Sequence, residues 1–309
     1  MKQQAQIPES EPSGVLIVNK HGGATSHDVV NKIRRLYGTR RVGHTGTLDP
    51  MATGVLVVLV GRAAKAAEYL ASDRKQYRAT LRLGFTTDSE DTTGTVLTRS
   101  DKLPSAEELE TVLPDFCGKI QQIPPMYSAL KVNGKKLVDL ARQGQVIERQ
   151  PREIEIFQLN MLLTDTPSDY ILSVDCSGGT YIRTLCADIG AKLGCGGVMA
   201  SLERTEACGF SIEKAHTVAE IEEMTETERL SLLMPTEQLF RSLSAINLSP
   251  FYERLIRSGC AVEQKKLKCD FPLSTRLRIY GADGKFFALG EVVEDAEGLA
   301  VKSVKLFVL

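Results

Sequence analysis

Residues 43–60 read GHTGTLDPMATGVLVVLV, a glycine-bounded loop followed without a break by an apolar run. Three glycines and a proline fall within the first twelve positions, so this part needs a shaped turn and cannot form a regular helix. The run from Val55 to Val60 has the composition of a buried strand. One acid, Asp49, stands between a leucine and a proline that stiffen the backbone. The stretch predicts a rigid loop, anchored against a core, that presents one carboxylate.

Two common functions of glycine-rich loops do not fit this one. The Gly-Lys-Ser/Thr ending of a phosphate-binding P-loop is missing. A metal site needs more ligands than His44 and Asp49, and the loop holds no cysteine or second acid. Spacing alone is equally typical of a structural turn and of an active-site loop.

Length and composition indicate a globular protein with two domains. The chain has 309 residues, of which 42% are hydrophobic and 25% are charged. Its N-terminus is polar, and the longest apolar run is far too short to span a bilayer. The seven cysteines include no Cys-x-x-Cys pair, which favours reduced thiols over disulfides or zinc. We therefore expect a cytoplasmic protein with no membrane partner and no metal.

The net charge of −1 hides an uneven distribution of charge. Residues 1–70 hold nine lysines and arginines against five acids, whereas residues 217–240 hold six glutamates against one arginine. A basic face could bind a polyanion while the whole molecule stays near neutral. The same charges are also typical of solvated helix faces, and charge alone favours that simpler interpretation.

The order of elements predicts a mixed fold. Alternation of polar and apolar residues predicts a strand over 75–84, with Tyr77, Ala79, Leu81 and Leu83 pointing to one side. Further strands are expected at 14–20, 119–123, 153–163, 169–176 and 198–210, and helices at 25–38, 62–71, 104–113, 137–142, 183–193 and 216–240. From about residue 246 a β-rich tail with its own turns follows. We therefore expect a flexible N-terminus (1–13), a main domain (14–245) and a small C-terminal domain (246–309).

Arg183 stands out by its position. It falls in the first turn of the helix expected after the Gly178-Gly179 turn, where the positive end of the helix dipole disfavours a cation. A residue placed against local preference needs another reason, usually a nearby carboxylate.

Five blocks, in order, resemble the signature motifs of the TruB family of pseudouridine synthases. They are GHTGTLDP at 43–50, LGFTTD at 83–88, PPMYSALK at 124–131, CSGGTYIR at 176–183 and LERT at 202–205. The resemblance implies an α+β pseudouridine synthase fold, with a long, mostly antiparallel mixed sheet, flanking helices and a cleft across the sheet. The tail is similar to the small PUA-like RNA-binding domain of bacterial members.

The activity implied by the resemblance is conversion of uridine 55 in the TΨC loop of tRNA to pseudouridine, by base flipping and without a cofactor. Breaking the bond between the ribose and uracil N1 builds positive charge on the sugar, which a carboxylate stabilises. Asp49 matches the family's catalytic aspartate. It either attacks the sugar or removes a proton from it, and the sequence does not choose between these roles.

The resemblance also assigns partners to Asp49. Arg183 matches the arginine that pairs with the catalytic aspartate, keeping it ionised and oriented. Tyr77 matches the tyrosine that stacks on the target base and helps to remove the C5 proton. Without the family, a tyrosine opening an inward row of a strand is more typical of the core.

Other matches concern binding of the RNA. Tyr181 and Leu202 match residues that contact the flipped uridine, for which apolar walls are suited. His44 matches the residue that fills the gap left in the RNA loop. Contacts to phosphate are expected from Lys20 and from the arginine pairs at 34–35 and 40–41. From the residues alone, Tyr181 and Leu202 are more typical of core, His44 of a loop hydrogen bonder and Arg183 of a surface cation.

Two other functions remain open. A non-catalytic tRNA-binding or tRNA-folding protein could keep this fold, but it would not need the set Asp49, Tyr77 and Arg183. An enzyme that works with a guide RNA would keep the chemistry, but the short tail and the lack of basic extensions disfavour it. We therefore expect a stand-alone enzyme, a monomer with tRNA as its partner and no guide RNA.

Overall fold

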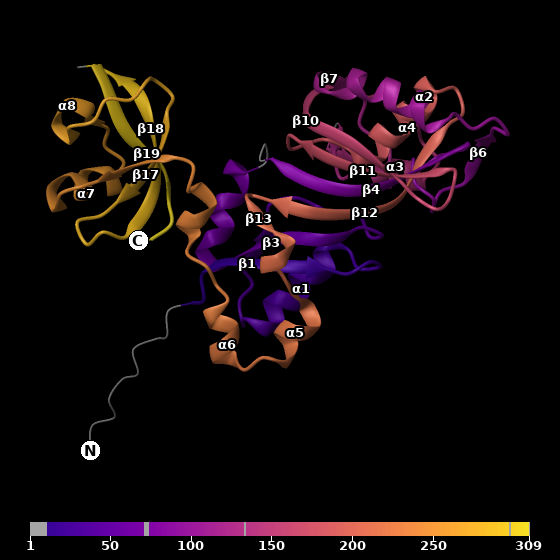
Figure 1. Ribbon diagram of the computed structural model, residues 1–309. Coiled ribbons are helices and arrows are strands. Elements are labelled where there is room, and N and C mark those ends of the chain that lie inside the picture. The colour runs from indigo at the N-terminus through magenta and orange to yellow at the C-terminus, as the bar shows by residue number, and fades with distance from the viewer. Residues whose placement is uncertain (1–10, 71–73, 133, 297, 309) are drawn as a thin grey trace.

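The computed structural model describes residues 11–70, 74–132, 134–296 and 298–308, so most of the predicted flexible N-terminus (1–13) lies outside the described residues. A ten-stranded mixed sheet dominates the fold (Figure 1), with the order β14-β1-β3-β12-β4-β11-β10-β7 and with β2 and β13 attached to β3 and β12. Its strands are β1 (Gly14–Lys20), β2 (Val42–His44), β3 (Thr53–Val60), β4 (Lys75–Leu83), β7 (Gly118–Gln122), β10 (Arg152–Leu163), β11 (Asp169–Cys176), β12 (Gly197–Ala207), β13 (Phe210–Ser211) and β14 (His216–Thr217). The pairs β1–β14 and β3–β12 are parallel and the others antiparallel.

The two central sequence patterns fold as expected. In β4 the side chains alternate, and the inward row predicted from the sequence, Tyr77, Ala79, Leu81 and Leu83, is buried in one apolar core. In β3 the residues Val55–Val60 are all buried, because one apolar core covers each face of this strand. A continuous apolar run is typical of such doubly covered strands. The loop that precedes β3 is therefore anchored in the most buried part of the molecule.

Helices cover the sheet and its ends (Figure 1). They are α1 (Ser26–Leu36), α2 (Ala106–Val112), α3 (Leu137–Arg142), α4 (Ile182–Lys192), α5 (Val218–Glu223) and α6 (Glu226–Ser231), with 3₁₀ helices η1 (Gly61–Tyr69), η2 (Leu113–Phe116), η3 (Ile212–Lys214) and η4 (Thr236–Phe240). Small two-stranded ribbons are formed by β5 (Phe85–Thr87) with β6 (Val96–Arg99), and by β8 (Lys131–Val132) with β9 (Lys135–Lys136). At the start of α1, Thr25 and Asp28 form the capping box expected from their spacing.

Three expected elements differ in the structure. The alanine-rich segment 62–71 is a 3₁₀ helix over its described part, in which Ala63 and Ala66 line up three residues apart against the core. The expected helix 216–240 is interrupted, because Met224 and Pro235 adopt extended backbone between α5, α6 and η4. The strand expected over 198–210 ends at Ala207, where Cys208 and Gly209 turn the chain with positive φ.

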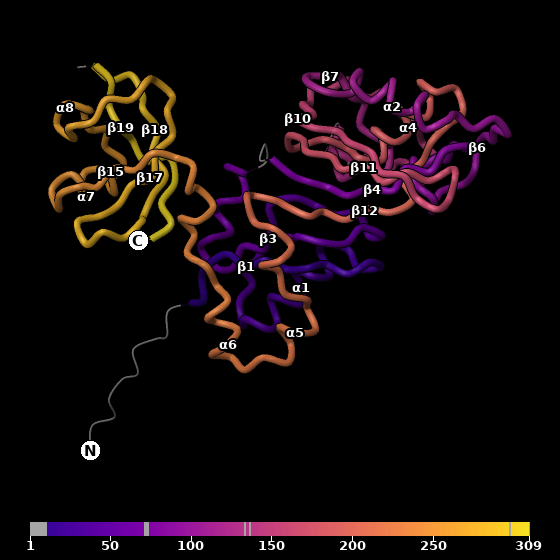
Figure 2. The backbone as a smooth tube through the Cα atoms, in the orientation of Figure 1, coloured from indigo at the N-terminus to yellow at the C-terminus, as the bar shows by residue number. Residues whose placement is uncertain are grey.

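The C-terminal residues form a separate lobe beside the large sheet (Figures 1 and 2). Its five-stranded sheet has the order β15-β17-β18-β19-β16, and its elements are β15 (Ser244–Asn247), α7 (Pro250–Arg257), β16 (Val262–Glu263), α8 (Gln264–Leu267), β17 (Arg276–Tyr280), β18 (Phe286–Asp295) and β19 (Gly298–Leu306). Phe286 and Phe307 share an apolar core with Phe240 of η4 and with β3. The predicted boundary between residues 245 and 246 remains a prediction.

Candidate active site

A cavity of about 1040 Å³ lies next to the glycine-bounded loop. It is bordered by the loop itself, by the acidic turn at residues 88–95, by residues 127–129 and by residues 179–183 before and at the start of α4. Six of the seven predicted site residues line it: His44, Asp49, Tyr77, Tyr181, Arg183 and Leu202. These residues come from four segments that lie far apart in the sequence, and the fold brings them to one cavity.

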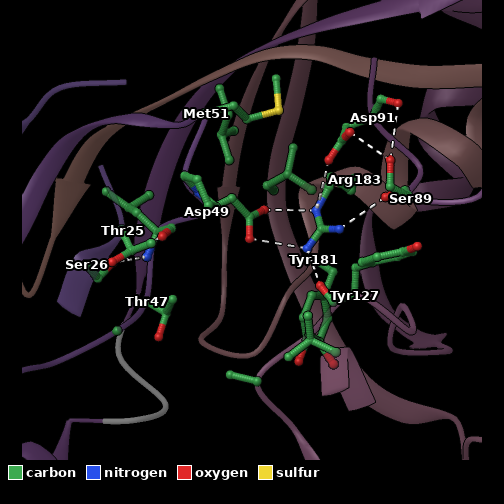
Figure 3. A pocket seen from close by; sticks show the side chains of 18 of the residues that line it. Thr25, Ser26, Thr47, Asp49, Met51, Ser89, Asp91, Tyr127, Tyr181 and Arg183 are labelled. Atoms are coloured by element: carbon green, nitrogen blue, oxygen red, sulfur yellow. Dashed lines mark hydrogen bonds and ion pairs between the residues drawn. The ribbon is translucent and has the colours of Figure 1, made fainter. Parts of the chain in front are cut away.

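Asp49 and Arg183 form a two-pronged ion pair in this cavity (Figure 3). Arg183 donates from Nε to Oδ2 of Asp49 at 2.8 Å and from Nη2 to Oδ1 at 3.2 Å. The Arg183 side chain is 5% exposed and that of Asp49 is 32% exposed, so the carboxylate still faces the cavity. Paired charge-assisted bonds of this kind fix the plane of a carboxylate as well as its charge.

Arg183 also donates to two backbone carbonyl groups, which fix the position of its guanidinium. Its Nη1 donates to the carbonyl oxygen of Ser89 at 3.0 Å, and its Nη2 donates to that of Tyr127 at 2.7 Å. A second carboxylate, that of Asp91, lies 4.0 Å from Nε and is buried. These acceptors and the two carboxylates explain why a cation is stable in the first turn of α4.

The segment before α4 has its own support. Gln122, at the end of β7, donates from its side chain to the carbonyl of Tyr181 at 3.0 Å and accepts from the Tyr181 amide at 2.8 Å. Gln122 is 2% exposed. Its amide side chain thus fixes the backbone of Tyr181, the N-cap residue of α4, at the wall of the cavity.

Tyr77 and Leu202 lie on the neighbouring strands β4 and β12 of the large sheet. In the pairing of β4 with β12, Leu202 stands opposite Ala79 and Arg204 opposite Tyr77. Burial raises the pKa of Tyr77, against the effect of the Arg204 charge, which lowers it. His44 on β2 is half-buried, and burial lowers its pKa, which favours the neutral ring.

Lys20 is a correction to the sequence analysis. It is fully buried, and its ammonium group donates to the carbonyls of His21 at 3.0 Å, Ala24 at 2.7 Å and Pro50 at 3.2 Å. It therefore supports the loop from inside. The sequence analysis predicted a contact with phosphate, and this prediction is wrong because the side chain is buried. Among the arginines predicted with it, Arg34 is half-buried and donates to Val42, whereas those at 35, 40 and 41 are exposed.

Sequence reasoning missed Arg204, the largest fully buried side chain of the described residues. It donates to the carbonyls of Val55 at 2.7 Å, Thr47 at 3.3 Å and Gly46 at 3.0 Å. The available signal was strand alternation, which puts Arg204 on the same face as Leu202.

Nothing in the described part of the chain suggests a bound metal. No group of three or more His, Cys, Asp or Glu side chains is arranged to hold an ion there. The seven cysteines all lie within these ranges and are free thiols. Nor does any described helix have the length and apolar character that a membrane crossing requires.

Comparison with known proteins shows the family of the chain. Residues 34–182 match the model of the TruB family pseudouridylate synthase N-terminal domain, and residues 183–241 match that of the tRNA pseudouridylate synthase B C-terminal domain. Proteins named tRNA pseudouridine synthase B from Clostridium novyi (strain NT) and Syntrophotalea carbinolica are 40% and 45% identical to the chain. The first alignment covers 95% of this chain and all of the relative, and the second covers 88% and 90%. The chain belongs to the TruB family.

Solved structures show the same fold. The crystal structure of a Cbf5-Nop10-Gar1 complex matches 96% of this chain and 85% of its own chain, with a TM-score of 0.70 and 23% identity. An H/ACA RNP bound to a substrate RNA containing 2′-deoxyuridine gives the same TM-score at 21% identity. The resemblance to the TruB family and the fold class predicted from the sequence are thus confirmed. In this TruB protein the junction of the two family models falls between Ile182 and Arg183, so residues from both parts line the cavity.

Proposed function

We propose that this protein converts the uridine at position 55 of the TΨC loop of tRNA to pseudouridine, as a stand-alone isomerase without a cofactor. Its relatives of 40–45% identity are named tRNA pseudouridine synthase B, which supports an isomerase acting on a tRNA uridine. The observation that carries the proposal is Asp49, which faces a cavity large enough for a nucleotide while Arg183 fixes its carboxylate.

The reaction moves one glycosidic bond. With the uridine turned out of the RNA loop, the bond between C1′ and N1 breaks and leaves positive charge on the ribose. Asp49 stabilises this charge, either by attacking the sugar or by removing a proton from it. The uracil then turns and forms the bond between C1′ and C5, and at this step the bond from Asp49 to C1′ breaks or the proton taken by Asp49 returns to the sugar. C5 loses its proton and N1 gains one, so the product is an isomer of the substrate.

The cavity walls have roles that suit this sequence of steps. Tyr77 lies under the base and is placed to help remove the C5 proton, and Tyr181 and Leu202 complete the apolar walls that keep water from the separated uracil. His44 fills the space that the everted nucleotide leaves in the RNA loop. The exposed arginines at 35, 40 and 41 contact phosphates, which makes affinity depend on salt.

The wider setting follows from the same proposal. The enzyme acts in the cytoplasm as a monomer, with tRNA as its partner and no guide RNA. The chains from the Cbf5-Nop10-Gar1 complex and from the H/ACA RNP are only 21–23% identical to this chain, so their partners are not carried over to it.

The test is the release of tritium from C5-labelled uridine in a bare tRNA transcript, with magnesium and with chelator. Asp49→Asn should release none and still bind tRNA, whereas Asp115→Asn, an exposed acid that pairs with Lys192, should act like the wild type. Turnover by Asp49→Asn would refute the assignment of Asp49, whereas no tritium release by the wild type would favour the non-catalytic tRNA-folding alternative. Activity only after a second RNA is added would refute the stand-alone enzyme.

A further inference from the structure

The backbone around Asp49 is held by buried polar side chains from other elements. Arg204 binds the carbonyls of Gly46, Thr47 and Val55, as given above. Ser26 of α1 donates from Oγ to the carbonyl of Leu48 at 3.1 Å and accepts from the Leu48 amide at 2.8 Å. Lys20 holds the carbonyl of Pro50. These three side chains are at most 2% exposed, so water does not compete for the carbonyls they bind.

Arg204 provides the largest share of this support, and on both sides of the acid. Two of its acceptors, Gly46 and Thr47, precede Asp49 and the third, Val55, follows it. Within the described residues Arg204 forms no ion pair with a carboxylate, although burying an unpaired charge is costly. The compensation comes from three backbone carbonyls, two in the irregular loop (Gly46 and Thr47) and one at the start of β3 (Val55).

The backbone of Arg204 is docked on the same loop. Arg204 pairs with Gly54 in the parallel contact of β12 with β3. Gly54 has a φ of +98°, and a Cβ added there would lie 2.3 Å from the carbonyl oxygen of Arg204. The end of the loop therefore fits against β12 only with glycine at position 54.

We propose that Arg204 is a positioning residue that fixes the backbone on both sides of Asp49 and so aims the carboxylate at Arg183 and the ribose. This inference rests on the proposed function of Asp49. Each of the three nitrogens of Arg204 donates to a backbone carbonyl of the loop or of β3, and only 1% of the residue is exposed, so its main action is on this backbone; its guanidinium also interacts with Tyr77, and both residues line the cavity. The three nitrogens of a guanidinium are spread over a planar fork and reach these three acceptors together, whereas a lysine has a single ammonium nitrogen.

The deciding variant is Arg204→Lys, which keeps the positive charge and most of the aliphatic stem but loses the guanidinium fork. Arg204→Met removes the charge as well as the fork. A displacement of about 1 Å at a reacting group can cost about 100-fold in rate, so we expect kcat for tritium release to fall by about that factor in both. KM and tRNA affinity should stay within about twofold of the wild type. Hydrogen exchange of the peptide covering 43–54 should become faster.

Two controls separate positioning from stability. Ile256→Ala removes buried apolar volume from the C-terminal lobe, so it destabilises the chain away from the loop. Arg229→Met removes another arginine, whose Nη1 binds the carbonyl of Met224 outside the cavity. Both should keep wild-type kcat and wild-type exchange of residues 43–54 at temperatures well below their melting points.

The outcomes are distinct. Wild-type kcat in Arg204→Lys would overturn the proposal, and so would a rise in KM of this variant with kcat unchanged. The proposal also fails if Arg204→Lys and Ile256→Ala, compared at the same stability, lose kcat to the same extent. If the wild type itself releases no tritium from tRNA, the proposed function fails. Positioning is then judged by exchange alone, and unchanged exchange of 43–54 in a folded Arg204→Lys would refute it.

Discussion

Replacing Arg183 by methionine removes the partner of Asp49 while keeping an unbranched apolar side chain in place of the arginine stem. Two charge-assisted hydrogen bonds to Asp49, at 2.8 and 3.2 Å, are lost, together with those to the carbonyls of Ser89 and Tyr127. The buried carboxylate of Asp91 also loses its nearby cation. The variant thus leaves the catalytic carboxylate free to turn and leaves several buried acceptors without a donor.

The expected effect on the rate follows from these bonds. A hydrogen bond to a charged group contributes about 1.5–3 kcal/mol, and exposure of the Asp49 side chain, at 32%, screens part of this. A net loss of about 3–4 kcal/mol in the transition state is therefore reasonable, which corresponds to a fall in kcat of about 100-fold to 1000-fold. Affinity for tRNA should change far less, because Arg183 is buried behind Asp49.

The assay is single-turnover release of tritium from C5-labelled tRNA, with filter binding of the same tRNA and a melting curve for each variant. Arg183→Lys keeps the charge without the fork and should fall between Arg183→Met and the wild type. If Arg183→Met stays within about threefold of the wild-type rate, the pair with Asp49 is not needed for catalysis. If affinity falls as much as the rate, Arg183 belongs to RNA binding and the reasoning fails.

Three further predictions concern stability. Burial lowers the pKa of Lys20 from 10.5 to about 8, so between these pH values the unfolded chain binds more protons than the folded chain. The free energy of unfolding should therefore rise with pH, relative to that of Lys20→Met, in urea titrations at pH 7 and pH 10. Gly54→Ala places a Cβ against a carbonyl of β12 at positive φ and should cost at least about 2 kcal/mol in urea unfolding, whereas Gly43→Ala, whose Cβ meets nothing within 4 Å, should cost much less. Phe307→Ala should cost about 3–5 kcal/mol and speed proteolysis of the C-terminal lobe, whereas the exposed Val308→Ala should stay within about 0.5 kcal/mol of the wild type.

Local periodicity was sufficient for the strands that form the sheet floor. In β4 the alternation of side chains follows directly from a strand with one buried face, and in β3 the unbroken apolar run follows from two covered faces. Helix type was less accessible, because the alanines of η1 have high propensity for an α-helix while their packing selects a 3₁₀ helix.

The acid and its partner could be predicted for different reasons. Asp49 was marked by the stiff loop around it, and Arg183 by its unfavourable place at a helix start, which called for a carboxylate. Their pairing spans 134 positions of sequence, so it needed the family resemblance and not a local pattern.

The supporting residues could not be found in this way. Lys20 was assigned to phosphate together with the nearby arginine pairs, yet its ammonium group turns inward to three carbonyls. Arg204 and Gln122 bind backbone groups 149–158 and 59 positions away. Every residue carries such groups, so no residue type in the sequence marks the partner.

A reaction without a cofactor places the whole task of charge stabilisation on groups that are already in place. Asp49 is bonded to Arg183 in the free protein, so its carboxylate does not need to reorganise when positive charge develops on the ribose. The carbonyls that hold Arg183 belong to Ser89 in the acidic turn and to Tyr127 in a second segment that lines the cavity. A shift of either segment as RNA enters would therefore move the guanidinium group of Arg183, and with it the carboxylate of Asp49. We expect substitutions that loosen these two segments to lower kcat even where they touch neither the base nor the sugar.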